Sequence, residues 1–460
     1  MGYYLKQEKG FYKHLFLLTL PVVLQNLVTT SLGLVDTFMV GMVGDIEMAA
    51  VTAANTPIFV LQCIIFGMQS GLGILVSQYW GHRDMENIRR STNVAFLMVF
   101  LLTLLTSAAA LLFPEQIMLL VTDNLQLVPV GAGYLRIVAC SYLFNGFSMV
   151  YLAAQRSMEN PKLGMYVLIV SMLLNTVLNY VMIFGKLGLP ALGVEGAAIA
   201  TFSSRVVEFV ISLVYALRCK QMPLMPACIL RPGKATFRSF VKFSTPVLLN
   251  ETLWGTGTSL YTVIMGHMAG STDLISAYTV AGNIDKMVTV AIFGVAAAAA
   301  VIVGKEVGMG GKNAYPIGQA LTFVAFCTGF GVAIAEQLLF WLVLKPHVLP
   351  LFSMTAASAS LCVTMMICYS ISAPLHAFAT TGIVGVLRGG GDVRIAMLID
   401  VLPLWCFTLP LLVLLGLVLH APIAIFCFIM ATESALKVPF GLHRIRSGKW
   451  IHDVTQDLNA

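Results

Sequence analysis

The chain has 460 residues, of which 58% are hydrophobic and only 10% are charged, and its mean hydropathy is +0.88. A soluble globular protein carries roughly 25% charged residues, so this composition excludes a soluble enzyme or nucleic-acid-binding domain, whatever the net charge of +6. Apolar runs of about 20 residues recur from end to end, and each can cross a bilayer core of roughly 30 Å as a helix. The sequence therefore predicts an integral membrane protein.

Charged and Pro- or Gly-rich stretches divide the chain into twelve apolar spans, which predicts an all-α membrane fold. The spans are expected to start near residues 15, 48, 91, 127, 163, 195, 238, 272, 315, 354, 394 and 421. The charged N-terminus leads into the first span without a small-residue cleavage pattern, so we predict no removable signal peptide.

Lys and Arg occur mainly in alternate connections between the spans. Arg83, Arg89 and Arg90 lie in one of them, and Lys437 lies near the end of the last span. The opposite loops are neutral or acidic, for example FPEQIMLLVTDN at 113–124. The positive-inside rule places the basic side, and with it both termini, in the cytoplasm.

The two halves of the chain resemble each other in the same orientation. LPVVLQ (20–25) matches TPVLLN (245–250), and AAQRSMENPKLGM (153–165) aligns with GVLRGGGDVRIAM (385–397). Duplicated halves usually build a cavity between them, although common ancestry alone would also explain the repeat. The expected parts are an N-terminal six-helix bundle (1–218), a cytoplasmic linker (219–236), a C-terminal six-helix bundle (237–446) and a cytoplasmic tail (447–460).

A polar stripe runs along one face of the first span. Gln25, Thr29, Gly33 and Asp36 are spaced by four, four and three residues, so they share a helix face. Ionisable groups inside a membrane are costly, so this stripe is expected to face a wet interior.

Polar side chains on the fifth and sixth spans complement Asp36. Asn175 and Asn179 are one helical turn apart, and so are Ala197 and Thr201. A carboxylate, two amide oxygens, a hydroxyl and a helix carbonyl suit Na⁺, which prefers oxygen ligands. The carboxyl group itself could instead take up and release a proton, and the spacing does not choose between the two. The alternative is that the asparagines only hydrogen-bond neighbouring helices.

In the second half the acidic residues fall at other positions. Glu251 lies on the seventh span near the bilayer midplane and is a candidate coupling residue, while Tyr261 occupies the repeat position of Asp36. Asp400 and Glu433 are candidates for a cavity or a proton path. The repeat therefore predicts a duplicated fold with divergent chemistry.

Other charged residues in or near the spans have simpler explanations. Arg205 and Glu208 are three residues apart on one helix and are expected to neutralise each other. Arg388 and the following GGGD (389–392) are expected to end a helix in a charged glycine turn.

Motifs of enzymes and cofactor sites are missing from the sequence. There is no HExxH, GxSxG, Walker A or Rossmann GxGxxG pattern, and the nine cysteines form no CxxC pair. We therefore expect no enzyme activity, no cofactor and free thiols, and any uphill transport must use an ion gradient.

Several motifs in order carry a family resemblance. VDTFMVG (35–41), ILVSQYWG (74–81), LNTVLNYVMIFGKLGLPALGVEGAAIAT (174–201), NETLWGTGTSLY (250–261) and LRGGGD (387–392) resemble those of a multidrug and toxic compound extrusion (MATE) transporter of bacterial type. The resemblance implies a V-shaped pair of six-helix bundles around a central cavity. It also implies antiport, with amphipathic organic compounds, often cations, exported in exchange for H⁺ or Na⁺.

Further expectations follow from this resemblance. It implies a multi-pass protein of the bacterial plasma (inner) membrane that contacts lipid and small-molecule substrates, without nucleic acid or an obligate protein partner, and as a monomer. The residues that match the family's N-terminal cation site are Asp36, Asn175, Asn179, Thr201 and the backbone near Ala197. Glu251 matches a seventh-helix coupling acid. Sodium-coupled members have an Asp on the tenth helix, and at that position this chain has Ala377, beside His376. This difference disfavours a C-terminal sodium site and favours the N-terminal site or protonation of Glu251.

Three other functions compete with this interpretation. A lipid or polysaccharide-precursor flippase of the same superfamily often has more spans and a cationic cavity, whereas Arg205 and Lys286 are the main basic residues within these spans. A membrane-embedded enzyme would need a nucleophile or a metal cluster. An ion channel would conduct without counter-transport.

Overall fold

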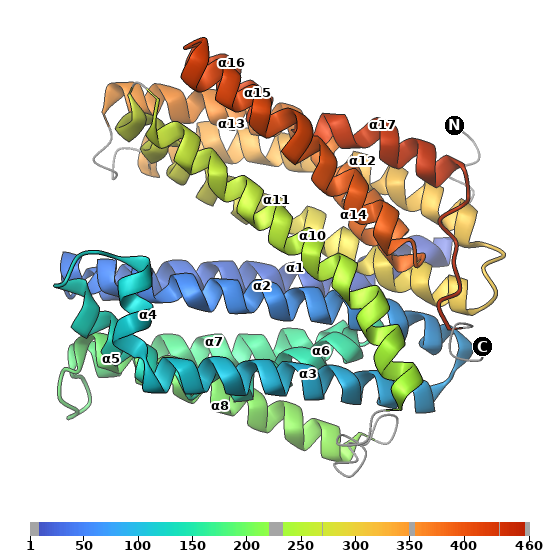
Figure 1. Ribbon diagram of the computed structural model, residues 1–460, viewed down its shortest axis with the longest axis horizontal. Helices are drawn as coiled ribbons and strands as arrows, with labels where there is room; N and C mark the ends of the chain where they lie inside the picture. The colour runs from blue at the N-terminus through green and yellow to red at the C-terminus, as the bar shows by residue number, and fades with distance from the viewer. Residues whose placement is uncertain (1–8, 220–232, 269, 349–354, 432, 456–460) are drawn as a thin grey trace. The chain divides into compact units, whose positions relative to one another are not determined.

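The computed structural model describes residues 9–219, 233–268, 270–348, 355–431 and 433–455, and these residues are almost entirely helical (Figure 1). The helices of the first half are α1 (Lys9–Gly41), α2 (Asp45–His82), α3 (Met85–Leu112), α4 (Pro114–Val121), α5 (Leu127–Ala139), α6 (Tyr142–Ser157), α7 (Pro161–Phe184) and α8 (Gly193–Arg218). Those of the second half are α10 (Lys234–Gly266), α11 (Ser271–Gly308), α12 (Ala314–Leu339), η1 (Phe340–Val348), α13 (Ala356–Thr380), η3 (Thr381–Leu387), α14 (Val393–Leu402), η4 (Pro403–Thr408), α15 (Leu409–Val413), η5 (Leu414–Val418), α16 (Ile423–Ala431) and α17 (Glu433–Arg446).

The helices account for the predicted spans in order. Within the described ranges, ten helices are long and apolar enough to cross a membrane, and α5 with α6, bent by 51°, make an eleventh. The seventh predicted span is α10, whose 33 residues are long enough but whose apolar run is interrupted by Asn250, Glu251 and a series of Thr, Gly and Ser residues. Most of the predicted linker (219–236) and the end of the predicted tail (447–460) lie outside the described residues.

The internal repeat is visible in the helix lengths. Both α1 and α10 have 33 residues and contain one proline, Pro21 and Pro246, at the same position along the helix. Both α2 and α11 have 38 residues. Because a proline inside a helix removes one backbone hydrogen bond, each long helix has a weak point at the same place.

The chain divides into two compact units, and the division falls inside these two helices. Among the described residues, unit 1 comprises those up to Val23 and those from Leu249 onward, and unit 2 comprises those within Leu24–Leu248. Both boundaries lie two residues after the proline, at the same register of the repeat. The boundaries predicted from the sequence, 1–218 and 237–446, instead lay on either side of the linker between the sixth and seventh spans.

Small residues explain why the first part of each long helix packs with the other half of the chain. A side chain at Gly67 or Gly71 of α2 would collide with the backbone of Leu248 or Ser244 of α10, so these glycines allow the two helices to pack closely. Likewise, Leu18 of α1 belongs to the buried cluster that contains Ala299 of α11. The exchange of helix segments is thus fixed by close packing of the kind common in membranes.

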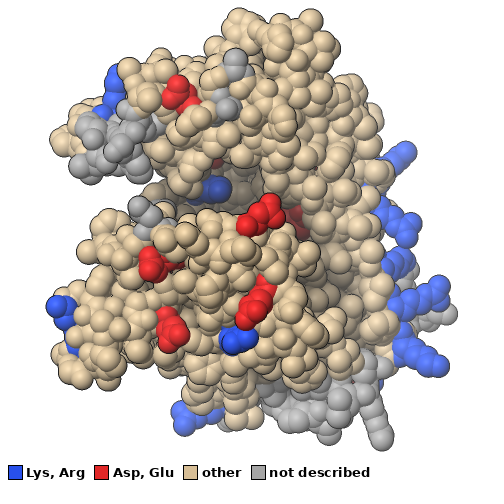
Figure 2. Space-filling view, turned by 60° about the vertical axis from the view of Figure 1, so that its left-hand side comes forward, with Lys and Arg blue, Asp and Glu red and all other residues tan. Residues whose placement is uncertain are grey.

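The outer surface suits a bilayer. Large apolar side chains such as Leu105 and Phe38 are 70% exposed, an arrangement that in water would form an aggregation-prone patch. Most of the surface seen in Figure 2 carries neither Lys or Arg nor Asp or Glu. These side chains are therefore positioned to contact lipid.

Candidate functional site

Unit 2 contains a cavity of about 200 Å³ among α1, α2, α5, α6, α7 and α8. Its polar lining includes Asp36, Asn55, Asn145, Asn179, Thr201 and Arg205. Such a mixture of one carboxylate, one guanidinium and several amides inside a helical bundle is typical of a site for a small polar or charged ligand.

The turn between α7 and α8 sets the position of two lining helices. Gly185 ends α7 in the left-handed conformation with φ +66°, which glycine adopts without strain. Leu192 N–H then donates to the Met182 carbonyl at 2.9 Å, and a side chain at Gly196 would collide with that carbonyl. The stretch GKLGLPALGVEG therefore brings the start of α8 directly against the end of α7.

Asp36 and Asn179 meet in this cavity. Asn179 Nδ2 donates to Asp36 Oδ1 at 2.5 Å and to Asn175 Oδ1 at 3.1 Å. The remaining polar atom, Asn179 Oδ1, is buried and has no hydrogen-bond partner among the described residues. A free amide oxygen beside a carboxylate suits a cation with oxygen ligands, so the donor set fits Na⁺ as well as a proton.

The structure places the five predicted cation-coupling residues at two depths. Asp36, Asn179, Ala197 and Thr201 line the cavity. Asn175 stands one turn behind, where its Nδ2 lies 3.5 Å from Ser204 Oγ and its Oδ1 accepts from Asn179. It therefore orients Asn179 rather than facing the cavity.

Arg205 and Glu208 form the expected ion pair, with Arg205 Nη1 2.7 Å from Glu208 Oε2. Glu208 is buried, whereas Arg205 reaches the cavity and its positive charge acts on Asp36. With Asp36, these ionised side chains sum to one negative charge. The group would become neutral on binding one proton or one monovalent cation.

The rest of the polar stripe on α1 has backbone partners. Gln25 Nε2 is buried and donates to the Pro161 carbonyl at 2.7 Å, and Thr29 Oγ1 donates to the Gln25 carbonyl of its own helix at 2.9 Å. Only Gly33 and Asp36 of the stripe line the cavity. The two ends of the stripe thus serve different purposes, helix contact and cavity.

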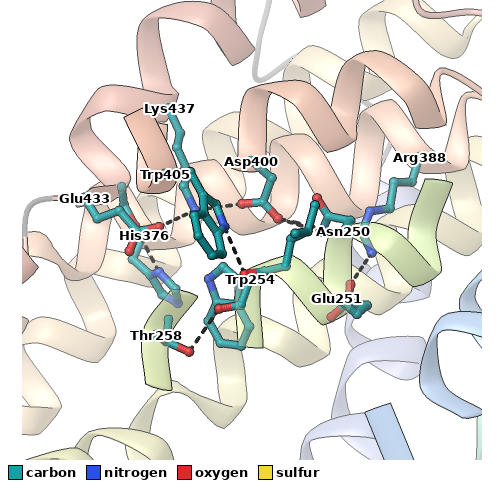
Figure 3. Close-up of polar contacts among 12 residues, drawn as sticks. Asn250, Glu251, Trp254, Thr258, His376, Arg388, Asp400, Trp405, Glu433 and Lys437 are labelled. Atoms are coloured by element: carbon teal, nitrogen blue, oxygen red, sulfur yellow. Dashed lines mark hydrogen bonds and ion pairs between the residues drawn. The ribbon is translucent and has the colours of Figure 1, made fainter. Parts of the chain in front are cut away.

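A second polar constellation lies in unit 1 and is drawn in Figure 3. Arg388, only 2% exposed, lies with its Nη1 2.7 Å from Glu251 Oε1. The predicted coupling acid is therefore paired with the arginine that the sequence placed in a glycine turn.

Lys437 joins two further acids of this constellation. Its Nζ lies 2.7 Å from Asp400 Oδ1 and 2.6 Å from Glu433 Oε1. Asn250 Nδ2 donates to Asp400 Oδ2 at 2.8 Å, and Tyr261 OH donates to Glu433 Oε2 at 2.6 Å. Lys437 is 5% exposed, although the sequence grouped it with the cytoplasmic basic residues.

The position aligned with the tenth-helix acid of sodium-coupled relatives is fully buried and apolar. Ala377 packs in a cluster with Ile292, Val332 and Ala373. Its neighbour His376 hydrogen-bonds to Ser434, with Nδ1 3.1 Å from Oγ (Figure 3). The aligned position itself therefore has no carboxylate, and its neighbour His376 lies beside Glu433 of the constellation.

Two residues that line the cavity were not predicted from the sequence. Metal sites were predicted only from sequence motifs. Asn55 and Asn145 line the cavity, and their signal was the same as that of Asn179, an amide inside an apolar span. Over the described ranges no three His, Cys, Asp or Glu residues are grouped to hold a metal ion, and none of the eight described cysteines forms a disulfide.

Comparison with known proteins connects this architecture to transporters. The MatE family model matches residues 21–181 and 246–414. The probable multidrug resistance protein NorM of Rhizobium meliloti is 26% identical over 406 residues, 84% of this chain and 83% of that protein. The multidrug resistance protein MdtK of Pectobacterium atrosepticum is 26% identical over 85% of each chain. The uncharacterized transporter YisQ of Bacillus subtilis is 23% identical over 95% of this chain and 94% of its own.

Solved structures share the fold over nearly the whole length. The eukaryotic MATE transporter AtDTX14 superposes with a TM-score of 0.83 at 17% identity, covering 97% of this chain and 98% of its own. A point mutant of the Vibrio cholerae MATE transporter VcmN gives 0.82 at 20% identity, covering 96% and 98%.

Proposed function

Because the chain belongs to the MatE family, we propose that it is a multidrug exporter that moves amphipathic organic compounds, often cations, out of a bacterial cell in exchange for H⁺ or Na⁺. The family relationship supports a multi-pass transporter, and bacterial relatives support the inner membrane as its location. The names of NorM and MdtK support multidrug resistance as the role of those relatives. We propose that this chain works as a monomer, with lipid and its substrates as its partners.

The observation that carries the proposal is the meeting of Asp36 with Asn179 inside the cavity of unit 2. The carboxylate, the free Asn179 Oδ1 and the Thr201 side of α8 line one space. Their surplus negative charge gives an incoming cation or proton a binding energy that an uncharged pocket would lack.

We assign the coupling to alternating access. The ion binds Asp36 while the cavity faces outward, and its neutralisation removes the charge that holds Asn179 in its present hydrogen bond. A ligand shifts a conformational equilibrium only if it binds the two conformations differently, so the geometry at Asp36 must differ between them. Thr201 and the Ala197 backbone complete the coordination, and Asn175 orients Asn179.

The test is efflux of a fluorescent organic cation from proteoliposomes under an imposed H⁺ gradient or an imposed Na⁺ gradient. Wild-type protein is expected to respond to at least one gradient. Asp36→Asn should lose the response at least tenfold, because the amide cannot change its charge.

Asp123→Asn is the matched control, since Asp123 is exposed and lies outside the cavity. It should retain wild-type efflux. Wild-type rates and unchanged gradient dependence in Asp36→Asn would refute the proposed role of Asp36. A wild type that responds to neither gradient would refute ion-coupled exchange.

A further inference from the structure

The segment that follows α17, residues 447–455, packs against the rest of unit 1 (Figure 1). Trp450 in this segment has an exposed fraction of 0% and belongs to the same buried cluster as Val386 of η3. Its Nε1 donates to the Ile445 carbonyl at 3.0 Å. A buried indole contributes a large apolar contact, and its N–H here has the partner that burial requires. The segment is therefore docked by a side chain that lies outside the predicted membrane spans.

Two glycines provide the space for this indole. A Cβ at Gly390 would collide with the ring and the carbonyl of Trp450, and a Cβ at Gly318 of α12 would lie 2.8 Å from the same ring. The φ of Gly390 lies outside the left-handed region, so other residues could adopt its backbone conformation. Close contact with Trp450, not the shape of the turn, therefore explains a glycine at position 390.

The internal repeat supports this explanation, because the first half makes the same turn without the glycines. Gly391 has φ +91° in unit 1, and its repeat counterpart Glu159 has φ +63° in unit 2. Each N–H donates at 3.0 Å to the carbonyl of the arginine three residues earlier. At the repeat position of Gly390, unit 2 has Met158, whose side chain is buried. The turn thus tolerates side chains, and the glycine in unit 1 leaves room for the C-terminal segment.

Further contacts hold the segment at this turn. The His452 N–H donates to the Gly390 carbonyl at 2.8 Å, which gives a partner to a carbonyl at the end of a helix. Arg444 of α17 lies with its Nε 2.7 Å from Asp392 Oδ2, and its Nη2 donates to the Lys449 carbonyl at 3.1 Å. One guanidinium group therefore joins the turn to the segment.

The turn that is held in this way also positions Arg388. This residue precedes Gly390 by two positions, and its Nη1 lies 2.7 Å from Glu251 Oε1 of α10 (Figure 3). Because α10 enters unit 1 at Leu249, Glu251 is its first charged residue there. The pair that ties α10 to unit 1 thus depends on a backbone turn that Trp450 covers.

We propose that residues 447–455 form a clasp in which Trp450 is a positioning residue: its docking on Gly390 holds Arg388 against Glu251 and anchors α10 to unit 1 during exchange. The proposal rests on the exchange function proposed above, because the anchor is needed when the protein changes conformation. Without the clasp the turn relaxes, and the distance between the guanidinium and the carboxylate is no longer fixed.

Hydrogen exchange followed by mass spectrometry tests the docking in detergent. A peptide covering 447–455 should exchange roughly tenfold more slowly in wild type than in Gly390→Ala, whose new Cβ has three Trp450 atoms as its nearest neighbours. Gly331→Ala is the matched control, because a Cβ at Gly331 of α12 meets nothing within 4 Å. It should exchange like wild type. Equal exchange in all three proteins would overturn the docking.

A double-mutant cycle on Arg388 and Glu251 tests the positioning. Midpoints of thermal unfolding are measured for the cycle in the wild-type, Trp450→Ala and Gly331→Ala backgrounds. The non-additive part of the midpoint shift should fall by roughly half or more in Trp450→Ala and stay unchanged in Gly331→Ala. A segment that only adds stability would lower all four midpoints of the cycle and leave the non-additive part as in wild type. That result would overturn the positioning role.

Efflux of a fluorescent organic cation from proteoliposomes tests the role in exchange. Trp450→Ala should lose gradient-driven efflux several-fold. Trp450→Phe should recover most of it, since the phenyl ring still packs on Gly390 although it lacks the Nε1 donor. Gly390→Ala removes the same contact from the other side and must repeat the loss, and every variant must elute as one monodisperse peak.

The outcomes separate this proposal from the exchange function. Wild-type efflux in both Trp450→Ala and Gly390→Ala would overturn the clasp as a part of exchange. A wild type that shows the docking and the Arg388–Glu251 coupling but transports nothing would keep the docked segment and refute the exchange function.

Discussion

Asp36 in unit 2 and Asp400 in unit 1 are both carboxylates inside helical bundles of the same repeat, but their partners differ. Asp36 is held by the neutral amide of Asn179 beside an open cavity. Asp400 is held by Lys437 at 2.7 Å and by the Asn250 amide at 2.8 Å. A neutral partner leaves a charge available for an incoming ion, whereas a fixed cation already occupies that role.

The two copies of the duplicated fold therefore carry different kinds of polar site. In unit 1 the bridges through Arg388 and Lys437 join α10, α14 and α17 and the residue that follows η3. In unit 2 the polar contacts at Asp36 join α1 to α7 through one amide. We infer that the charge network of unit 1 fixes structure and that the cavity of unit 2 exchanges ions.

The largest effect on stability is expected for Lys437→Met. The change removes the cation of Glu433 and the nearer of the two cations at Asp400, and removing one partner of a buried pair costs about 3 to 5 kcal/mol. The midpoint of thermal unfolding in detergent should fall far more than for Lys162→Met, whose lysine is exposed. Equal shifts for the two variants would mean that the network does not hold unit 1 together.

A double-mutant cycle on Arg388 and Glu251 should give the next largest effect. Arg388→Met removes the cation 2.7 Å from Glu251, whereas Glu251→Gln leaves Arg388 with Asp400 at 3.8 Å. The single change at Arg388 is therefore expected to cost more. The interaction free energy from the cycle should be roughly 1 to 3 kcal/mol.

Unfolding midpoints of the four proteins measure this coupling. Additive changes in the free energy of unfolding would contradict a direct ion pair between Arg388 and Glu251. Glu251 would then be a carboxylate without a fixed cation. Efflux under an imposed gradient, measured on the same proteins, tells whether Glu251 also couples.

How far the sequence predicts this molecule depends on the range of each interaction. The span order and the repeat follow from hydropathy and register, and the charge spacing of Arg205 and Glu208 predicted their pair correctly, because these signals are local. The unit boundary inside α1 and α10 was not predicted, since a helix that changes packing partners keeps one continuous apolar pattern.

Long-range pairing explains the remaining differences. Arg388 and Glu251 are 137 residues apart, and a charge near the end of a span looks the same in sequence whether it reaches water or a buried acid. Lys437 was grouped with cytoplasmic residues for this reason. Asp36 and Asn179, 143 residues apart, were predicted together only because intramembrane carboxylates and amides are rare enough to suggest one site.

The smallest effect on stability is expected for Asp36→Asn. The amide oxygen of the new side chain can still accept from Asn179 Nδ2, and Asp36 is only partly buried and shares the Arg205 charge with Glu208, so losing its own charge costs little. The free energy of unfolding should stay within about 1 kcal/mol of wild type or rise. The thermal midpoint in detergent, compared with that of Asp123→Asn, measures the change. A variant that unfolds as readily as Lys437→Met would show that Asp36 is a structural acid like Asp400. An unchanged midpoint together with lost efflux would show a charge kept for exchange, because selection for stability alone would not retain it.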